Sequence, residues 1–209
     1  MKKAARNHAR DPARRLRVLL ALGWYDYEVN RGVAAYAREA TWILNDMAGH
    51  TGGIPQHWRC DGILVSLPRA PSPEMAKLLK RGVPVVDLRL EYPKPLPRVA
   101  LDNEAIGRMA AQHFLDRGFT DLAYYQAYHG QVEIERMAGF RDAVEKAGRT
   151  FHHVNMTRAP GAFRRGDKRL DYLAGLIQAL PKPIAVMGQY DGSANEFVMA
   201  CERAGVPVP

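Results

Sequence analysis

The sequence predicts an α/β fold of two Rossmann-like lobes, and three observations support this. A helical stretch followed by a charged residue, a glycine and an apolar run recurs along the chain, as in "KLLKRGVPVVDL" and "HFLDRGFTDLAYY". Glycine ends helices because it adopts the left-handed conformation without a Cβ clash, and the apolar run predicts the next strand. Strands that alternate with helices form helix-covered parallel sheets, and the eight expected strands are many for one open sheet in 209 residues.

The first lobe is expected over residues 15–102, with a crossover near Asp102. Apolar runs predict strands over residues 17–22, 41–45, 62–67, 83–88 and 99–101. The stretches between them predict helices over residues 28–39 and 72–80. The proline-rich segment "EYPKPLPR", residues 91–98, predicts a surface connection.

The second lobe is expected over residues 103–209. Its predicted helices cover residues 103–117, 133–146, 168–179 and 193–204, and its predicted strands cover 121–125, 150–154 and 184–187. Apolar side chains at Ile106, Ala110 and Phe114 recur at helical spacing in the first of these helices, which is typical of a helix that covers a sheet.

The net charge of +8 is concentrated at the start of the chain. The segment through Arg17 holds seven Lys and Arg residues against the single acid Asp11, so it carries +6 of that charge. Because residues 1–14 are too few to fold unaided, we expect a basic, disordered arm, with phosphate contact as the alternative. The rest of the chain is nearly neutral, which does not favour a nucleic-acid-binding surface there.

The sequence predicts neither a membrane span nor a secreted protein. No apolar run approaches the roughly 18 residues that a spanning helix needs. The opening "MKKAARNHARDPARR" is basic but has no apolar core of a signal peptide, so we expect a cytoplasmic location. Cys60 and Cys201 lie far apart without a CxxC pattern, which predicts free thiols instead of a disulfide or metal site.

Polar residues directly after predicted strands are the first candidates for a binding site, because ligands of such sheets bind beyond the carboxyl ends of the strands. Tyr25 and Asp26 follow the first strand; a ring can pack on the apolar face of a sugar, and a carboxylate can accept hydrogen bonds from hydroxyls. Asp26 is equally suited to cap the next helix. For Asp87 and Asp102, which end the fourth and fifth strands, the same two interpretations stay open.

Three further candidates belong to the second lobe. Tyr190 and Asp191 follow its last strand, where Asp191 can cap a helix or face a ligand. Arg136 is expected in the first turn of its helix, where a cation opposes the helix dipole. A cation in this place needs another reason, and binding a ligand hydroxyl or carboxylate is one such reason.

Motifs of catalysis are absent from the sequence. It contains no GxSxG, GxGxxG, GxxxxGK[ST] or HExxH pattern, and no spacing pairs a nucleophile with a base. We therefore expect no enzymatic activity, no metal site and no cofactor.

Three segments together carry a family resemblance: "VALDNEAIGRMAAQHFLDRGFTDLAYY", "ERMAGFRDAVEKAG" and "PIAVMGQYDGSANEFVMACERAGVPVP". In order and spacing they resemble the effector-binding core of lac-repressor-type transcription regulators, which share their fold with periplasmic sugar-binding proteins. Within that superfamily the chain is most similar to the xylose-operon regulator type, through "YD" at Tyr25 and Asp26 and the following Val29, Gly32 and Val33.

The resemblance implies a periplasmic-binding-protein-like (type I) fold that is truncated at its C-terminal side. It also implies that a monosaccharide, xylose or a related pentose, contacts Arg136, Tyr190 and Asp191 in one lobe and Asp26 and Asp87 in the other. Sugar-driven closure of the lobes would then control operator DNA binding by an AraC-type helix-turn-helix part beyond Pro209. Members of this group usually form homodimers.

Two other functions stay open at this point. A periplasmic sugar-binding protein of transport shares the fold, but we expect a signal peptide there, and a Rossmann-class enzyme needs the glycine-rich phosphate loop that is absent after the first strand.

Overall fold

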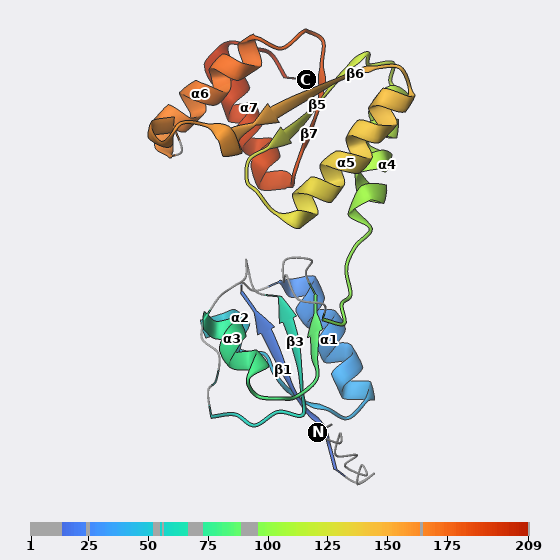
Figure 1. The fold of residues 1–209 in the computed structure, drawn as a ribbon, viewed down its shortest axis with the longest axis vertical. Coiled ribbons are helices and arrows are strands. Elements are labelled where there is room, and N and C mark those ends of the chain that lie inside the picture. The colour runs from blue at the N-terminus through green and yellow to red at the C-terminus, as the bar shows by residue number, and fades with distance from the viewer. Residues whose placement is uncertain are drawn as a thin grey trace, which may run out of the picture. The chain divides into compact units, whose positions relative to one another are not determined.

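The computed structural model describes residues 14–23, 26–51, 55, 57–66, 73–88, 96–163 and 165–208. The chain divides into two compact units, Met1–Ala100 and Leu101–Pro209, and each has its own parallel sheet (Figure 1). The boundary that the sequence predicts, near Asp102, lies two residues after this division.

The first unit is a four-stranded parallel sheet in the order β2-β1-β3-β4. Its strands are β1 (Arg17–Leu22), β2 (Ile43–Asn45), β3 (Gly62–Ser66) and β4 (Val85–Asp87). Helix α1 (Tyr27–Glu39) lies on one side of the sheet, and α2 (Met47–Thr51) and α3 (Pro73–Leu79) lie on the other (Figure 1). β1 is buried on both faces, as the central strand of a helix-covered parallel sheet must be.

The second unit is a three-stranded parallel sheet in the order β6-β5-β7. Its strands are β5 (Asp121–Gln126), β6 (Thr150–Asn155) and β7 (Ala185–Gly188). Helices α4 (Asn103–Leu115) and α5 (Gln131–Lys146) lie to one side, and α6 (Gly166–Gln178) and α7 (Asp191–Ala204) to the other (Figure 1). Two short 3-10 turns, Met156–Arg158 and Gly161–Phe163, lie between β6 and α6.

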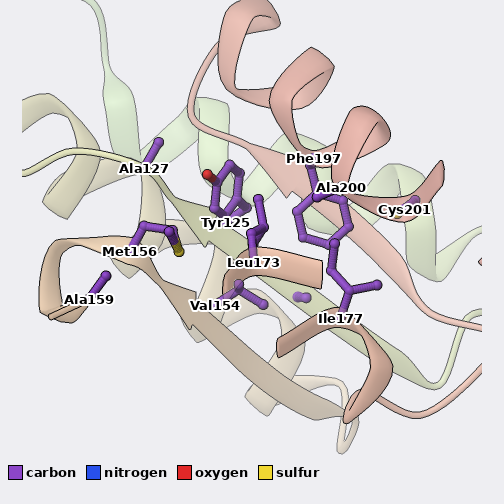
Figure 2. Close-up of a cluster of buried hydrophobic side chains, with 11 residues drawn as sticks. Tyr125, Ala127, Val154, Met156, Ala159, Leu173, Ile177, Phe197, Ala200 and Cys201 are labelled. Carbon is purple, nitrogen blue, oxygen red and sulfur yellow. The ribbon is translucent and has the colours of Figure 1, made fainter. Parts of the chain in front are cut away.

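Two adjacent tyrosines of β5 anchor the two cores of this unit. Tyr124 and Tyr125 are fully buried, and because successive strand residues point to opposite faces, they enter different cores. Tyr124 packs with Phe140 of α5, while Tyr125 packs with Phe197 of α7 at a ring-centroid distance of 5.2 Å. Figure 2 shows the second of these cores, in which Tyr125 carries the cluster's hydroxyl oxygen.

The expected α/β class with helix-covered parallel sheets is confirmed, and seven of the eight expected strands are present. The prediction of a strand over residues 99–101 is wrong: only Arg98 bridges to Asp87, and the chain then leaves the sheet. Val99 and Leu101 are 67% and 68% exposed, so no buried apolar area stabilises a fifth strand there. Helix α2 is an element that the sequence does not predict.

Three smaller expectations meet the structure as follows. Of the expected basic arm, residues 1–13 lie outside the described part, and Arg14 pairs with Asp61 at 2.7 Å. Cys60 and Cys201 are free, as expected. No helix among the described residues has the length and apolar character that crossing a bilayer requires.

Strand β7 lies at the edge of its sheet. Within the described residues it pairs only with β5. An apolar hollow of about 830 Å³ lies beside it, lined by Val186 of β7, Phe197 of α7 and Val206 beyond α7.

Candidate functional site

The carboxyl ends of β5 and β7 form an edge of the second sheet where several polar side chains make hydrogen bonds to the backbone. The two strands are hydrogen-bonded neighbours and run parallel, so the residues that follow them meet at one edge. Ala127 and Tyr128 follow β5, and Gln189 and Tyr190 follow β7. Ligand sites of open parallel sheets lie at such edges.

Gln189 joins the two strand ends. Its side chain is 2% exposed, and its Oε1 accepts hydrogen bonds from the backbone N–H groups of Ala127 at 2.6 Å and Tyr128 at 2.9 Å. Its Nε2 donates to the carbonyl oxygen of Tyr128 at 3.1 Å. One amide side chain thus satisfies three backbone groups of the β5–α5 loop and holds that loop against β7.

Arg136 is held at this edge by residues from two other segments. It lies in the second turn of α5, because the helix begins at Gln131, and not in the first turn that the sequence predicts. Its Nε donates to Oδ1 of Asn103 at 3.0 Å, and its Nη1 donates to the carbonyl oxygen of Gln189 at 2.8 Å. Among the described residues, its Nη2 donates no hydrogen bond. The guanidinium is therefore fixed in place while N–H donors remain for a ligand.

A close crossing of α4 and α5 brings Asn103 and Arg136 together. A Cβ added at Gly107 would lie 2.0 Å from the carbonyl oxygen of Arg136, and one added at Gly139 would lie 2.1 Å from that of Glu104. Only glycine permits this backbone contact. Gly139, the glycine of "ERMAGF" three residues after Arg136, thus allows α5 to pack closely on α4.

Tyr190 and Asp191 follow β7 as the sequence predicts, but the helix cap lies one residue earlier than expected. Tyr190 is the N-cap of α7, and its backbone N–H donates to Oγ of Ser193 at 3.0 Å. Asp191 is the first helical residue, and its carboxylate makes no hydrogen bond with the described residues. Both side chains are exposed at the same edge as Gln189.

A second cluster at this edge was not found from the sequence. The guanidinium of Arg169 in α6 pairs with the carboxylate of Glu196 in α7, and the hydroxyl of Tyr125 donates to Oε2 of Glu196 at 2.6 Å. Burial raises the pKa of Tyr125, and the hydrogen bond to Glu196 raises that of Arg169. Burial opposes the charged form of Glu196, but the hydrogen bonds from Arg169 and Tyr125 outweigh it and lower its pKa. Arg169 and Glu196 lie inside two different helices, and no sequence pattern predicts that they pair.

The structure places the aspartates that the sequence singled out in different settings. Asp26 is the N-cap of α1, and its Oδ1 accepts from the backbone N–H of Val29 at 3.1 Å. Asp87 ends β4 and is 2% exposed. Asp102, which joins the second unit, accepts from the N–H of Ala105 at 2.8 Å and caps α4, so its place at a strand end is wrong. Tyr25 lies outside the described residues.

The first sheet has another polar strand end that the sequence analysis missed. Asp46 follows β2 directly, and its Oδ2 accepts from Nδ2 of Asn30, a 9% exposed residue of α1, at 3.0 Å. The hydrogen bond from Asn30 lowers the pKa of Asp46. The rule that picks polar residues after strands would have found it. In the described part of the chain, no three His, Cys, Asp or Glu side chains could hold a metal ion.

Comparisons with known proteins agree with this architecture. Residues 111–209 match the periplasmic binding protein-like domain. A xylose operon regulatory protein of Haemophilus influenzae is 25% identical over 202 residues, a match that covers 88% of this chain. The match covers 50% of the relative, so the chain spans about half of its length. The resemblance to this type of regulator is confirmed.

Solved structures show the same fold. A xylose-binding transcription activator, xylR, matches with a TM-score of 0.72 and 22% identity, over 94% of this chain and 52% of that one. A glucose-galactose binding protein from Geobacillus stearothermophilus matches with a TM-score of 0.66 and 17% identity, over 91% of this chain and 74% of that one. The expected periplasmic-binding-protein-like fold is thereby confirmed.

Proposed function

Because the chain has the periplasmic-binding-protein-like fold, we propose that it is the effector-binding part of a transcription regulator of carbohydrate use, with a monosaccharide as its effector. The observation that carries the proposal is Arg136, which Asn103 and Gln189 hold at the carboxyl edge of the second sheet with N–H donors left over. Such donors suit the hydroxyl oxygens of a sugar. Xylose or a related pentose is the first candidate, since the Haemophilus relative and the activator xylR are named for xylose.

In this proposal the remaining predicted contacts are Tyr190 and Asp191 in the second unit and Tyr25, Asp26 and Asp87 in the first. Asp26 already caps a helix, but a capping carboxylate uses one oxygen and has further acceptor sites for hydroxyls. Asp191 is not used in capping and so is the better placed acceptor. We expect no catalysis and no cofactor, since the proposed task is recognition alone.

The sugar acts on transcription if it binds one state of the regulator more tightly than another. The expected closure of the two units, the AraC-type DNA-binding part beyond this chain, and the homodimer all stay predictions. A regulator that binds operator DNA works in the cytoplasm, which is the location that we propose.

The test is calorimetric titration of the intact gene product with D-xylose, D-ribose, D-glucose and D-galactose. We expect at least one sugar to bind, and the variant Arg136→Ala to lose that binding. Arg141→Ala, which removes an exposed arginine of the same helix, is the matched control and should bind like the wild type. Arg136→Lys keeps the charge but loses the fork of donors, so its binding should be weakened. The absence of binding by all four sugars would contradict the proposal.

A transport protein is the second candidate, because a substrate-binding protein of a sugar ABC transport system shares the fold. The two functions separate in a gel-shift assay with the DNA upstream of the gene. A sugar-dependent shift supports the regulator, whereas sugar binding without a shift and a processed, secreted form of the protein support transport.

A further inference from the structure

Two exposed tyrosines form a stacked pair at the carboxyl edge of the second sheet. The rings of Tyr128 and Tyr190 have centroids 6.4 Å apart and planes inclined by 21°. The two residues are 54% and 50% exposed, so the pair presents a large aromatic surface to solvent. Aromatic side chains that are placed in this way at a strand-end edge are typical of binding surfaces.

The backbone on both sides of the pair is held in place. Gln189 binds the N–H and the carbonyl oxygen of Tyr128, and Ser193 accepts from the N–H of Tyr190. A tyrosine side chain has only two rotatable bonds, so little conformational entropy remains to be lost when a ligand packs on it.

Arg169 supports the first ring. Its guanidinium carbon lies 5.5 Å from the ring centroid of Tyr128, within the range of a cation–π interaction. Its Nη2 donates to Oε2 of Glu196 at 3.0 Å, and the two charged side chains are 12% and 19% exposed. Desolvation offsets part of the attraction in a largely buried ion pair. Its clear structural effect is to fix the guanidinium against the ring.

The tyrosine pair and Arg136 belong to one edge. Arg136 donates to the carbonyl oxygen of Gln189, the residue before Tyr190, and the side chain of Gln189 holds Tyr128. The edge thus combines an aromatic surface with hydrogen-bond donors. A monosaccharide presents the matching pattern, an apolar face of C–H groups bordered by hydroxyls.

We propose that Tyr128 and Tyr190 form the stacking surface for the ring of the monosaccharide effector, and that Arg169, held by Glu196, is the positioning residue of Tyr128. This inference rests on the proposed function, because it needs a sugar at the edge that carries Arg136.

The experiment measures the dissociation constant of the intact gene product for whichever of D-xylose, D-ribose, D-glucose and D-galactose binds. Tyr128→Leu keeps apolar bulk but removes the ring, and we expect the constant to rise about tenfold. Tyr128→Phe keeps the ring and should stay within about threefold of the wild type. Tyr36→Leu is the control, since Tyr36 is also exposed, at 57%, and also contacts another ring, but lies in the last turns of α1.

A double-mutant cycle tests the positioning role. Arg169→Met should weaken binding about fivefold in the wild-type background but have no further effect in Tyr128→Leu, where no ring remains to be positioned. A merely structural role would weaken both backgrounds equally, and melting temperatures without sugar show any loss of fold. If the wild type binds no sugar, both proposals fail. If it binds and Tyr128→Leu binds equally well, or Arg169→Met acts equally in both backgrounds, this inference alone is overturned.

Discussion

The carboxyl edges of the two sheets use their polar side chains differently. In the first unit, Asp26 bonds a backbone group only three residues away, and Asp46 bonds Asn30 across 16 residues. In the second, Gln189 bonds Tyr128 across 61 residues of sequence, and Arg136 bonds Gln189 across 53. A local cap stabilises one element, whereas long-range bonds fix several elements against each other. The second edge is therefore fixed by contacts among several elements, as the proposed sugar site needs.

The largest expected effect comes from breaking the helix crossing that supports this edge. In Gly139→Ala the new methyl group meets the carbonyl oxygen of Glu104, so α4 and α5 must separate. We expect a loss of about 3 kcal/mol in the free energy of unfolding, measured with urea. Gly175→Ala in α6 is the control: nothing lies within 4 Å of its added Cβ, and alanine's helix propensity should make it neutral or slightly stabilising. Equal stability of the two variants would show that the crossing is not tight.

The next largest effect should follow from Gln189→Ala. It leaves the buried N–H of Ala127 and two backbone groups of Tyr128 without their partner, which should cost about 2 kcal/mol in the free energy of unfolding. The amide hydrogens of these two residues should also exchange faster with deuterium. Gln178→Ala removes an exposed glutamine and should change neither quantity. Unchanged exchange at Ala127 in Gln189→Ala would remove the basis for a preorganised edge.

A matched pair of aspartates sharpens the comparison between the units. Asp26→Ala removes an N-cap and should cost about 1 kcal/mol, whereas Asp26→Ser should restore most of it. Asp191→Ala removes a carboxylate that does not cap α7 and should cost less than about 0.5 kcal/mol in the absence of sugar. Urea unfolding of the three variants checks this order, and a larger loss in Asp191→Ala would reverse the comparison.

The smallest expected effect concerns pH. The folded-state pKa of Glu196 is lowered, so its contribution is fully present above the ordinary glutamate pKa of about 4.3 and is lost as pH falls through the folded value. The stability difference between wild type and Glu196→Gln should thus be largest near neutral pH and shrink below about pH 4. Glu202→Gln, at an exposed position of the same helix, is the control and should leave the free energy of unfolding at neutral pH near that of the wild type. A constant difference across pH would mean that the charge of Glu196 is not what stabilises the fold.

Much of the fold could be predicted because its signals are local. The glycines that end helices and the apolar runs after them located most helices and strands, since left-handed backbone and strand burial each depend on a few adjacent residues. The same reasoning proposed a strand over residues 99–101 that is wrong, because whether a short apolar run forms a strand depends on a neighbour that can cover it.

The sequence by itself determined the alternation of helices and strands, the parallel sheets and the place of Tyr190 and Asp191 after β7. Only the tertiary structure decided which polar groups act together: Gln189 with Tyr128, Asn103 with Arg136, and Arg169 with Glu196. The physical reason is distance along the chain. A hydrogen bond between residues tens of positions apart depends on how whole elements pack, and no short pattern of residues records that packing.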